Sequence, residues 1–437
     1  MKHLLKMALA SACLLSAGPL RAHDAAQASA AADGATPAAS PVAAAWDRYY
    51  AEIAKTREAL EASPQFKEFP EQRQRGYHAL IEAQAMVYNF AIAPRTLTPR
   101  VFRNTGWQTE IYTLGGNGAD FDYRQLFLDG HHTYRLTGNM RGSRVILGQL
   151  SGTLPGGNSP LHTNYDWQDF KVNADGSFEV ILSAQKQPGN WIQLDPDSEY
   201  QWIQFRPTVD TWDGKPAEFK VERISADIPG YLGADADTAE AVARRIDRAT
   251  GYLHYITEEW TTQFYPRSKA NAGGPNIFRA LGKQISGEVG SPTANYLMGA
   301  FHVGKDEALI VEVPEKPRGA YWSFQLFDVY LKTLNFRTNQ SMLNEYQLQQ
   351  DPDGKYRIVI SATDPGVPNW LDTTGLTDGQ FLLRDYRTTK GITPVVTTVK
   401  LKDLRKHLYP KTPTVSPEQR AAELKARANG YLLRHGE

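Results

Sequence analysis

Two stretches of the chain alternate between apolar and polar residues, as a β-strand with one packed face requires. The apolar positions are Phe178, Val180 and Leu182 in the first stretch and Tyr356, Ile358 and Ile360 in the second. Polar residues such as Glu179 and Arg357 lie between them. The pattern predicts antiparallel strands that are packed on one face and partly solvated on the other.

Both stretches belong to an internal repeat. Asp175-Gly176, Ser183-Ala184 and Asn190-Trp191 recur in the same order as Asp353-Gly354, Ser361-Ala362 and Asn369-Trp370, and the copies continue to Phe205-Arg206 and Leu383-Arg384. A repeat indicates the architecture before any single element is assigned. A residue that both copies retain is therefore more often part of the fold than part of a reaction.

Helical spacing of apolar residues precedes and separates the copies. It runs through Trp46–Glu61, Pro70–Ala91 and Asp235–Phe264. Ser416 and Gln419 form a capping box that opens a last helix, and Gly430 is placed to end it. Each unit is thus helical at first and then contains roughly a hundred residues of short strands, a size typical of a β-sandwich.

The boundaries that follow are a signal peptide over 1–22, an Ala-rich flexible leader over 23–45, and helices plus a first sandwich over 46–230. A long helix plus a second sandwich occupy 231–410, and a C-terminal helix occupies 411–437. The signal has a basic start, an apolar core over 7–15 and a cleavage motif ending at Ala22. It predicts a periplasmic or secreted protein.

The only cysteine, Cys13, lies inside this signal, and the residues before it lack the Leu or Val that usually leads a lipoprotein motif. The mature protein would therefore contain neither a disulfide nor a thiol nucleophile. No other stretch is apolar enough to be a transmembrane segment.

Charge narrows the classes of partner. The 437 residues carry 48 basic and 48 acidic side chains, so the formal net charge is zero. This balance argues against binding nucleic acid, which requires a basic face. Aromatic residues make up 11% of the chain, which suits either a groove for a sugar or flat ligand or a β-rich core.

The repeat, together with Trp212-Asp213-Gly214 after the first copy and Tyr321-Trp322 in the second, resembles a bacterial family that carries the domain of unknown function 1214. The resemblance extends over about residues 100 to 400. It implies a jelly-roll-like sandwich that is often duplicated, and no established activity. The expected fold class is therefore mainly β with flanking helices (α+β), built from two tandem jelly-roll-like antiparallel β-sandwich units.

Candidate ligand-binding residues come from the repeated Asn-Trp pairs and from the most apolar strand. Asn190, Trp191, Asn369 and Trp370 combine an amide with a stacking ring, and Trp322 lies on an aromatic strand face. The alternative is structural, because Asn bonds loop backbone and Trp closes the end of a sandwich. Arg206 and Arg384 could bind a carboxylate bidentately, or pair with a carboxylate of the protein such as Asp378 or Asp385.

Candidate catalytic residues are Asp328, Tyr330 and Arg384. Alternation places Asp328 on the aromatic face of Tyr321–Asp328, where burial would raise its pKa and suit it to acid catalysis. The alternative is that Asp328 closes the strand and caps the next turn. A glycosidase would need a second carboxylate, for which the candidates are Asp129, Asp166, Asp169, Asp372, Asp378 and Asp385.

No metal or cofactor is expected. His131 and His132 are adjacent and would point to opposite faces of a strand, although one could serve as a base. The Gly-rich segment 115–119 precedes no helix that would hold a phosphate, so it is expected to be a loop.

Two functions remain. The first is a binding protein for a carbohydrate or other small organic ligand, held between the units or at the mouth of one sandwich. The alternative is a hydrolase or lyase that acts on a glycan or lipid-like substrate through carboxylate acid/base chemistry in the second unit. A binding protein should have an aromatic-lined cleft without a perturbed carboxylate, whereas an enzyme should have buried ionisable groups in one copy only.

Overall fold

The computed structural model describes residues 40–103, 113–159, 161–281 and 294–435. The expected signal peptide (1–22), with Cys13, and the leader up to residue 39 lie outside the described residues. No helix within the described ranges has the length and apolar character needed to span a bilayer.

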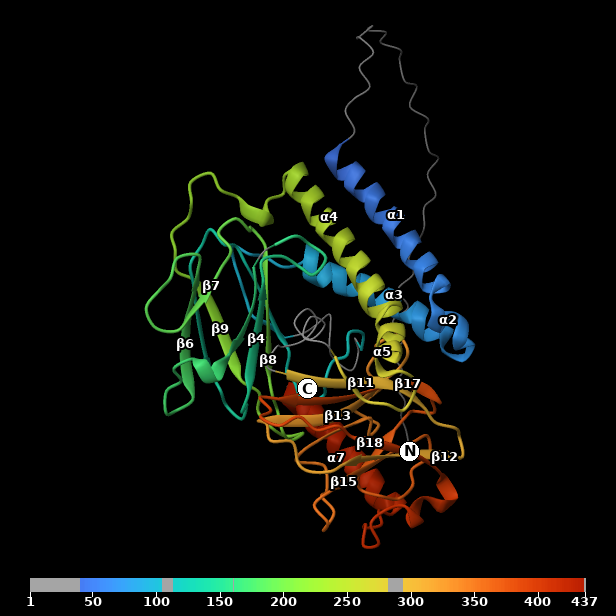
Figure 1. Ribbon diagram of the computed structural model, residues 1–437. Coiled ribbons are helices and arrows are strands. Elements are labelled where there is room, and N and C mark those ends of the chain that lie inside the picture. The colour runs from blue at the N-terminus through green and yellow to red at the C-terminus, as the bar shows by residue number, and fades with distance from the viewer. Residues whose placement is uncertain (1–39, 104–112, 160, 282–293, 436–437) are drawn as a thin grey trace, which may run out of the picture. The chain divides into compact units, whose positions relative to one another are not determined.

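The first sandwich consists of a five-stranded and a four-stranded sheet (Figure 1). The five-stranded sheet has the order β1 (Phe102–Arg103), β2 (Arg124–Leu128), β8 (Gln201–Pro207), β4 (Ile146–Ser151) and β5 (His162–Asp166). The four-stranded sheet has the order β7 (Trp191–Gln193), β6 (Ser177–Ser183), β3 (Tyr134–Asn139) and β9 (Glu218–Arg223). Their facing side chains form one apolar core around Trp167 and Phe205.

The second sandwich repeats this arrangement. Its five-stranded sheet has the order β10 (Arg279–Ala280), β11 (Ala294–His302), β17 (Asp378–Tyr386), β13 (Tyr321–Phe327) and β14 (Met342–Asn344). Its four-stranded sheet has the order β16 (Trp370–Asp372), β15 (Tyr356–Ser361), β12 (Glu307–Val313) and β18 (Val395–Lys400). Trp322, Phe324 and Phe381 lie in its core.

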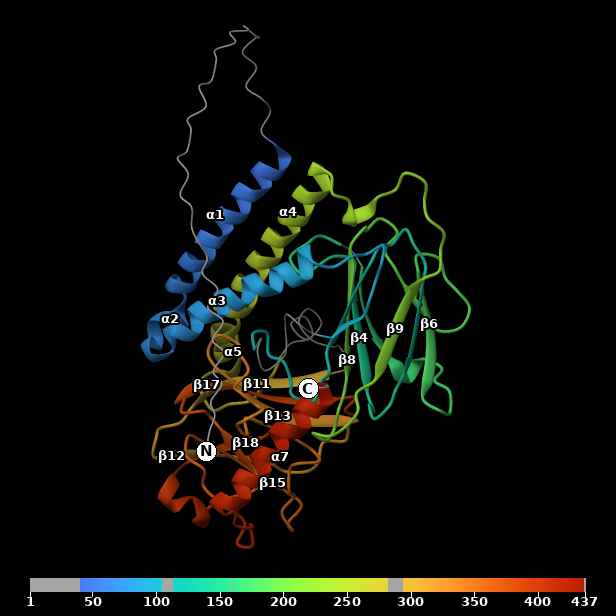
Figure 2. The same ribbon diagram turned by 180° about the vertical axis from the view of Figure 1, so that it is seen from behind.

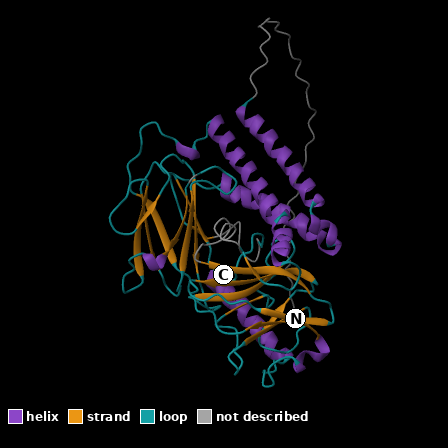
Figure 3. Ribbon diagram, viewed as in Figure 1, coloured by secondary structure: helices purple, strands orange, loops and turns teal. Residues whose placement is uncertain are grey.

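The strand orders of the two sandwiches correspond position by position, which confirms the predicted duplication and fold class. Figure 3 shows the strands of both sandwiches together with the helices. One detail differs from the antiparallel expectation. β7, which begins at the first Asn-Trp pair, runs parallel to β6. β16, which begins at the second pair, likewise runs parallel to β15.

The α-helices of the described residues are α1 (Pro41–Ala62), α2 (Pro64–Glu68), α3 (Arg73–Val87), α4 (Ala239–Tyr255), α5 (Phe264–Ala272) and α7 (Pro417–His435). Short 3-10 segments are η1 (Pro70–Gln72), η3 (Trp167–Asp169), η4 (Gly233–Asp235) and η6 (Leu401–Lys406). The π-helical segments η2 (Tyr88–Ile92) and η5 (Ile256–Thr262) continue α3 and α4. Figure 2 shows α1, α3 and α4 from behind.

Two helix boundaries differ from the sequence expectation. The Ala-rich leader was expected to extend to Ala45, but α1 begins at Pro41, because Pro suits the first helical turn and Ala has the highest helix propensity. Gly430 does not end α7, which continues to His435. A Cβ at Gly430 would lie 2.6 Å from the Cβ of Trp212, so this glycine allows close helix packing. The capping box is confirmed, with the backbone N–H of Gln419 donating to Ser416 Oγ.

The outer faces of the two five-stranded sheets are also buried. On β17, Phe381 and Leu383 point into the sandwich core, whereas Leu382 and Tyr386 point outward. The outward residues belong to a large apolar cluster that includes residues of α3, α4 and η5 and the outward residue Trp202 of β8. The cluster therefore joins both sandwiches to the helices, and the candidate site lies within it.

Candidate functional site

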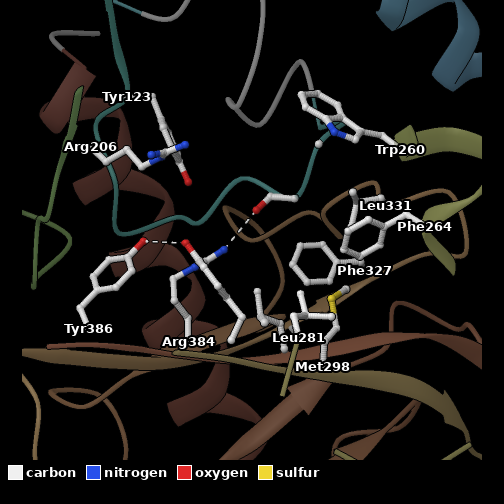
Figure 4. A pocket seen from close by; sticks show the side chains of 14 residues that line it. Tyr123, Arg206, Trp260, Phe264, Leu281, Met298, Phe327, Leu331, Arg384 and Tyr386 are labelled. Atoms are coloured by element: carbon white, nitrogen blue, oxygen red, sulfur yellow. Dashed lines mark hydrogen bonds between the residues drawn. The ribbon is translucent and has the colours of Figure 1, made fainter. Parts of the chain in front are cut away.

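A cavity of about 70 Å³ lies where the outer faces of β8 and β17 meet η5 and α5. Its lining comprises Gly115, Gly116, Tyr123, Arg206, Trp260, Phe264, Leu281, Tyr296, Met298, Phe327, Leu331, Leu382, Arg384 and Tyr386. Figure 4 shows Tyr123, Arg206, Arg384 and Tyr386 on one side and the apolar residues on the other. The cavity therefore has a polar, cationic half and an apolar half.

Arg206 and Arg384 are contributed by equivalent strands, β8 of the first sandwich and β17 of the second. Arg206 pairs across the sheet with Leu147, and Arg384 pairs with Ser323. Each guanidinium donates to the glutamine two residues beyond that partner, Arg206 Nη2 to Gln149 Oε1 at 2.6 Å and Arg384 Nη1 to Gln325 Oε1 at 3.2 Å. The repeat has thus placed the same Gln–Arg pair on both walls of one cavity.

Neither guanidinium forms an ion pair with a carboxylate of the described residues. Both side chains are buried, each 4% exposed. Within the described ranges, Arg384 donates to neutral oxygens, those of Gln325 and of the Gly116 carbonyl. Nη1 of Arg206 has no hydrogen-bond partner in the described structure. A buried charge without a counter-charge costs several kcal/mol in real proteins. The two buried guanidinium groups therefore lower the stability of the ligand-free protein.

Tyrosine hydroxyls complete the polar half. Burial raises the pKa values of Tyr123 and Tyr386, so both phenols stay neutral at physiological pH, and both lie within electrostatic reach of Arg206 and Arg384. The hydroxyl of Tyr386 lies 3.5 Å from that of Tyr296. The polar half therefore offers hydrogen-bond donors and positive charge, and the described residues of the cavity lining include no carboxylate.

The Gly-rich segment 115–119 is a loop, as expected, and it wraps one side of the cavity. The backbone N–H groups of Gly115 and Gly116 donate to the carbonyl of Leu331 at 3.1 and 3.2 Å. A Cβ at Gly118 would lie 2.7 Å from Arg384 Nη1, so a glycine at this position leaves room for the guanidinium. The loop was not predicted to take part in a site, because its contacts with residue 331 are distant in sequence.

Leu331 itself has a strained backbone, with a φ of 58° that a leucine rarely adopts. Asp328 stabilises this turn, since its Oδ1 accepts from the backbone N–H groups of Tyr330 at 2.9 Å and Lys332 at 3.0 Å. Backbone strain of this kind is common at functional sites, and the side chain of Leu331 forms part of the cavity wall.

The predicted catalytic residues Asp328, Tyr330 and Arg384 are not brought together. Arg384 lines the cavity, whereas Asp328 and Tyr330 do not. Asp328 is fully buried and caps the turn, and its Oδ2 lies 3.6 Å from Arg75 Nη1. Burial raises the pKa of Asp328, as expected. The geometry nevertheless favours the alternative weighed for Asp328, that of a turn cap.

The predicted ligand-binding pairs Asn190-Trp191 and Asn369-Trp370 make the same backbone contacts in both copies. Asn369 Nδ2 donates to the carbonyls of Gln349 and Arg357, and its Oδ1 accepts from the Gln349 N–H. Asn190 makes the equivalent three bonds to Lys171 and Glu179.

The tryptophans of these pairs also have matching partners. The indole N–H of Trp191 donates to Ser183 Oγ at 3.1 Å, and that of Trp370 donates to Ser361 Oγ at 3.0 Å. Their serines belong to the repeated Ser-Ala pair. None of the four Asn or Trp residues lines the cavity, so the contacts favour the structural alternative.

Several of the remaining candidates form contacts outside the cavity. Trp322 is buried in the second sandwich against Tyr356. Asp378 Oδ1 lies 2.7 Å from His302 Nδ1. Asp129 contacts His131 and Tyr231. Asp166 forms an ion pair with Arg387. Arg384 does not pair with Asp378 or Asp385, contrary to the ion-pair alternative, because it lies on the opposite face of β17 from Asp385.

Asp385 supplies a pH-dependent prediction. It is fully buried opposite Trp322, and this burial raises its pKa to about 6. The unfolded pKa is about 3.9, so the folded state binds the proton more tightly, and the stability that this provides below about pH 4 is lost as the pH rises to about 6.

Asp385→Asn should therefore raise the unfolding midpoint at pH 7.5 and have little effect at pH 4. Thermal unfolding at both pH values measures this, with exposed Asp213→Asn as the control. An equal effect of Asp385→Asn at both pH values would contradict the assignment.

Trp260, Tyr123, Gln149 and Gln325 were not predicted as site residues. Trp260 lies in η5, and π-helical segments inside α-helices are frequent at functional sites. The helical apolar pattern of 235–264 gives no sign of this extra residue per turn. A signal for the glutamines did exist, since Gln149 and Gln325 occupy equivalent places in the repeat.

Comparison with known proteins identifies the domain in both sandwiches. The family model described as "Protein of unknown function (DUF1214)" matches residues 156–206, in the first sandwich, and 302–390, in the second. The chain carries the DUF1214 domain. No curated protein sequence matches this DUF1214 chain.

A crystal structure of an uncharacterized protein from Burkholderia cenocepacia is similar to this DUF1214 chain. It is 23% identical, with a TM-score of 0.72, and the similarity covers 82% of this chain and 97% of that one. A protein from Vibrio parahaemolyticus is 13% identical with a TM-score of 0.43, covering 74% of this chain and 97% of that one. The first of these supports the fold of the DUF1214 chain.

Proposed function

We propose that this protein binds a small organic ligand in the cavity between its two sandwiches. The observation that carries the proposal is the pair of equivalent buried arginines, which converge on one partly aromatic cavity without a carboxylate partner in the described structure. Ligand pockets are typically mostly apolar with a few converging polar groups. A neutral carbohydrate would leave both guanidinium charges uncompensated, so it is the less favoured ligand.

The alternative function, a hydrolase or lyase that uses a carboxylate of the second unit, has less support. General acid/base catalysis needs an acid and a base within reach of the substrate, and the cavity lining offers neutral tyrosines and arginines. Asp328 is engaged in its turn.

Native mass spectrometry of the protein purified from its source cells, followed by a thermal-shift screen of small metabolites, tests the proposal. We expect the screen to find a small molecule that binds in the cavity and raises the unfolding midpoint of the protein. Met298→Trp, which fills the cavity, should remove the effect, whereas Trp introduced at the exposed Val395 should leave it unchanged. The absence of any stabilising compound, or equal binding to the Met298→Trp variant, would refute the proposal.

We also propose that the protein acts in the periplasm or outside the cell, because residues 1–22 have the pattern of a secretory signal. N-terminal sequencing of protein from fractionated cells should find a chain that begins at His23 in the periplasmic or extracellular fraction. An uncleaved chain in the cytoplasmic fraction would contradict this.

A further inference from the structure

The charge of the cavity restricts the kind of ligand. Arg206 lines the cavity, and its buried Nη1 has no hydrogen-bond partner in the described structure. Gln149 holds the other end of the same guanidinium through a 2.6 Å bond from Nη2, so the free nitrogen has a fixed position. An oxyanion bound to it would gain a charge-assisted hydrogen bond and offset the cost of burying the cation.

Arg384 adds a second positive charge from the other sandwich. Its Nη1 and Nη2 are held by Gln325 and Gly116, and the side chain lies over the ring of Phe121, 5.3 Å from the ring centroid. Arg384 is therefore fixed in place by neutral groups. Because the phenols of Tyr123 and Tyr386 are neutral, they add donors without reducing the positive charge.

The opposite half of the cavity restricts the rest of the ligand. It is formed by Trp260, Phe264, Leu281, Met298, Phe327 and Leu331, as Figure 4 shows. No charged side chain lies among these residues. A second charge at the far end of the ligand would be buried without a partner among the described residues, at a high cost. The ligand should therefore be charged at one end only.

The volume limits its size. Roughly 10–15 Å³ of cavity volume accommodates one water molecule. The cavity of about 70 Å³ therefore holds on the order of five waters. That is the scale of a small carboxylic acid with a compact apolar body.

We infer that the ligand is a small organic monocarboxylate, with its carboxylate at Arg206 and Arg384 and its aromatic or branched apolar body against Trp260 and Phe327. This inference rests on the proposed function and names the ligand class for the same cavity. Because one arginine comes from each sandwich, the bound carboxylate connects the two copies of the repeat.

Calorimetric titration of the purified protein with benzoate and isovalerate tests the inference, with benzamide as the neutral isostere of benzoate and inorganic phosphate as an anion without an apolar body. We expect the two carboxylates to bind. Benzamide should bind at least about tenfold more weakly because it loses a charge-assisted hydrogen bond, and phosphate should bind more weakly because it buries no apolar surface.

Two variants of Arg206 sharpen the test. Arg206→Met should weaken benzoate at least about tenfold and, by removing an uncompensated buried charge, should raise the unfolding midpoint of the ligand-free protein. Arg206→Lys keeps the charge but loses the planar fork, so its affinity should be intermediate. Arg135→Met, on the exposed face of β3, should change neither affinity nor the cavity.

The outcomes separate the two proposals. If benzamide binds as tightly as benzoate, the carboxylate assignment is wrong while ligand binding at the cavity stands. If phosphate binds as tightly as benzoate, the ligand is an inorganic anion and the monocarboxylate class is wrong. If neither these compounds nor any member of the metabolite screen binds, both proposals fall. Unaltered benzoate affinity in Arg206→Met would place the carboxylate elsewhere and overturn the inference.

Discussion

Replacement of Trp370 by alanine should lower the free energy of unfolding by about 3–5 kcal/mol, the usual cost of removing a buried tryptophan. The side chain is 5% exposed, packs with Val359 and Val367 and donates to Ser361. Urea denaturation measures the change. The loss of stability comes from lost packing around the indole. Because Trp370 does not line the cavity, the affinity of the cavity for a ligand should be unchanged.

The repeat offers a matched control. Trp191 occupies the equivalent position and makes the equivalent bond to Ser183, but it is only partly buried. Trp191→Ala should therefore cost roughly half as much as Trp370→Ala. A small loss of stability in Trp370→Ala together with a lost ligand would reverse this assignment and restore the prediction that the Asn-Trp pairs bind ligand.

Asp328→Ala should destabilise the protein by about 2–4 kcal/mol, because two buried backbone N–H groups lose their acceptor and the strained turn at Leu331 loses its cap. Asp328→Asn should cost less than about 1 kcal/mol, since the amide oxygen can accept the same two bonds and the buried carboxyl is removed. Denaturation of both variants measures the difference.

This pair of substitutions also discriminates between the functional alternatives. An acid catalyst would be inactivated by Asp328→Asn as fully as by Asp328→Ala, whereas a turn cap is preserved by asparagine. Ligand affinity should follow stability, falling in Asp328→Ala because Leu331 is displaced from the cavity wall, and remaining in Asp328→Asn. Equal destabilisation by both substitutions would contradict the capping role.

The fold could be predicted from the sequence because its determinants are local and repeated. The alternation in 177–183 and 356–361 identified β6 and β15, and the shared order of Asp-Gly, Ser-Ala and Asn-Trp identified the duplication. The helix start at Pro41 was missed because an Ala-rich segment has no apolar stripe, even though its intrinsic helix propensity is high.

The site could be predicted only in part, because it depends on which faces of distant strands meet. Arg206 and Arg384 were singled out, but alternation alone does not say that both point away from their own sandwich cores and toward one cavity. Asp328 shows the converse difficulty. A buried acid on an aromatic strand is typical of catalysis, and only the bonds to residues 330 and 332 identify its structural role.

The fusion of two units in one chain has a consequence for the symmetry of the cavity. Two identical subunits that shared such a site across a dyad would have to present the same groups twice, and their ligand would meet a two-fold symmetric surface. Here the equivalent arginines keep that symmetry, but the apolar wall comes from η5, α5 and the second sandwich alone. Covalent linkage has allowed the copies to diverge, so the cavity can distinguish the head of a molecule from its tail.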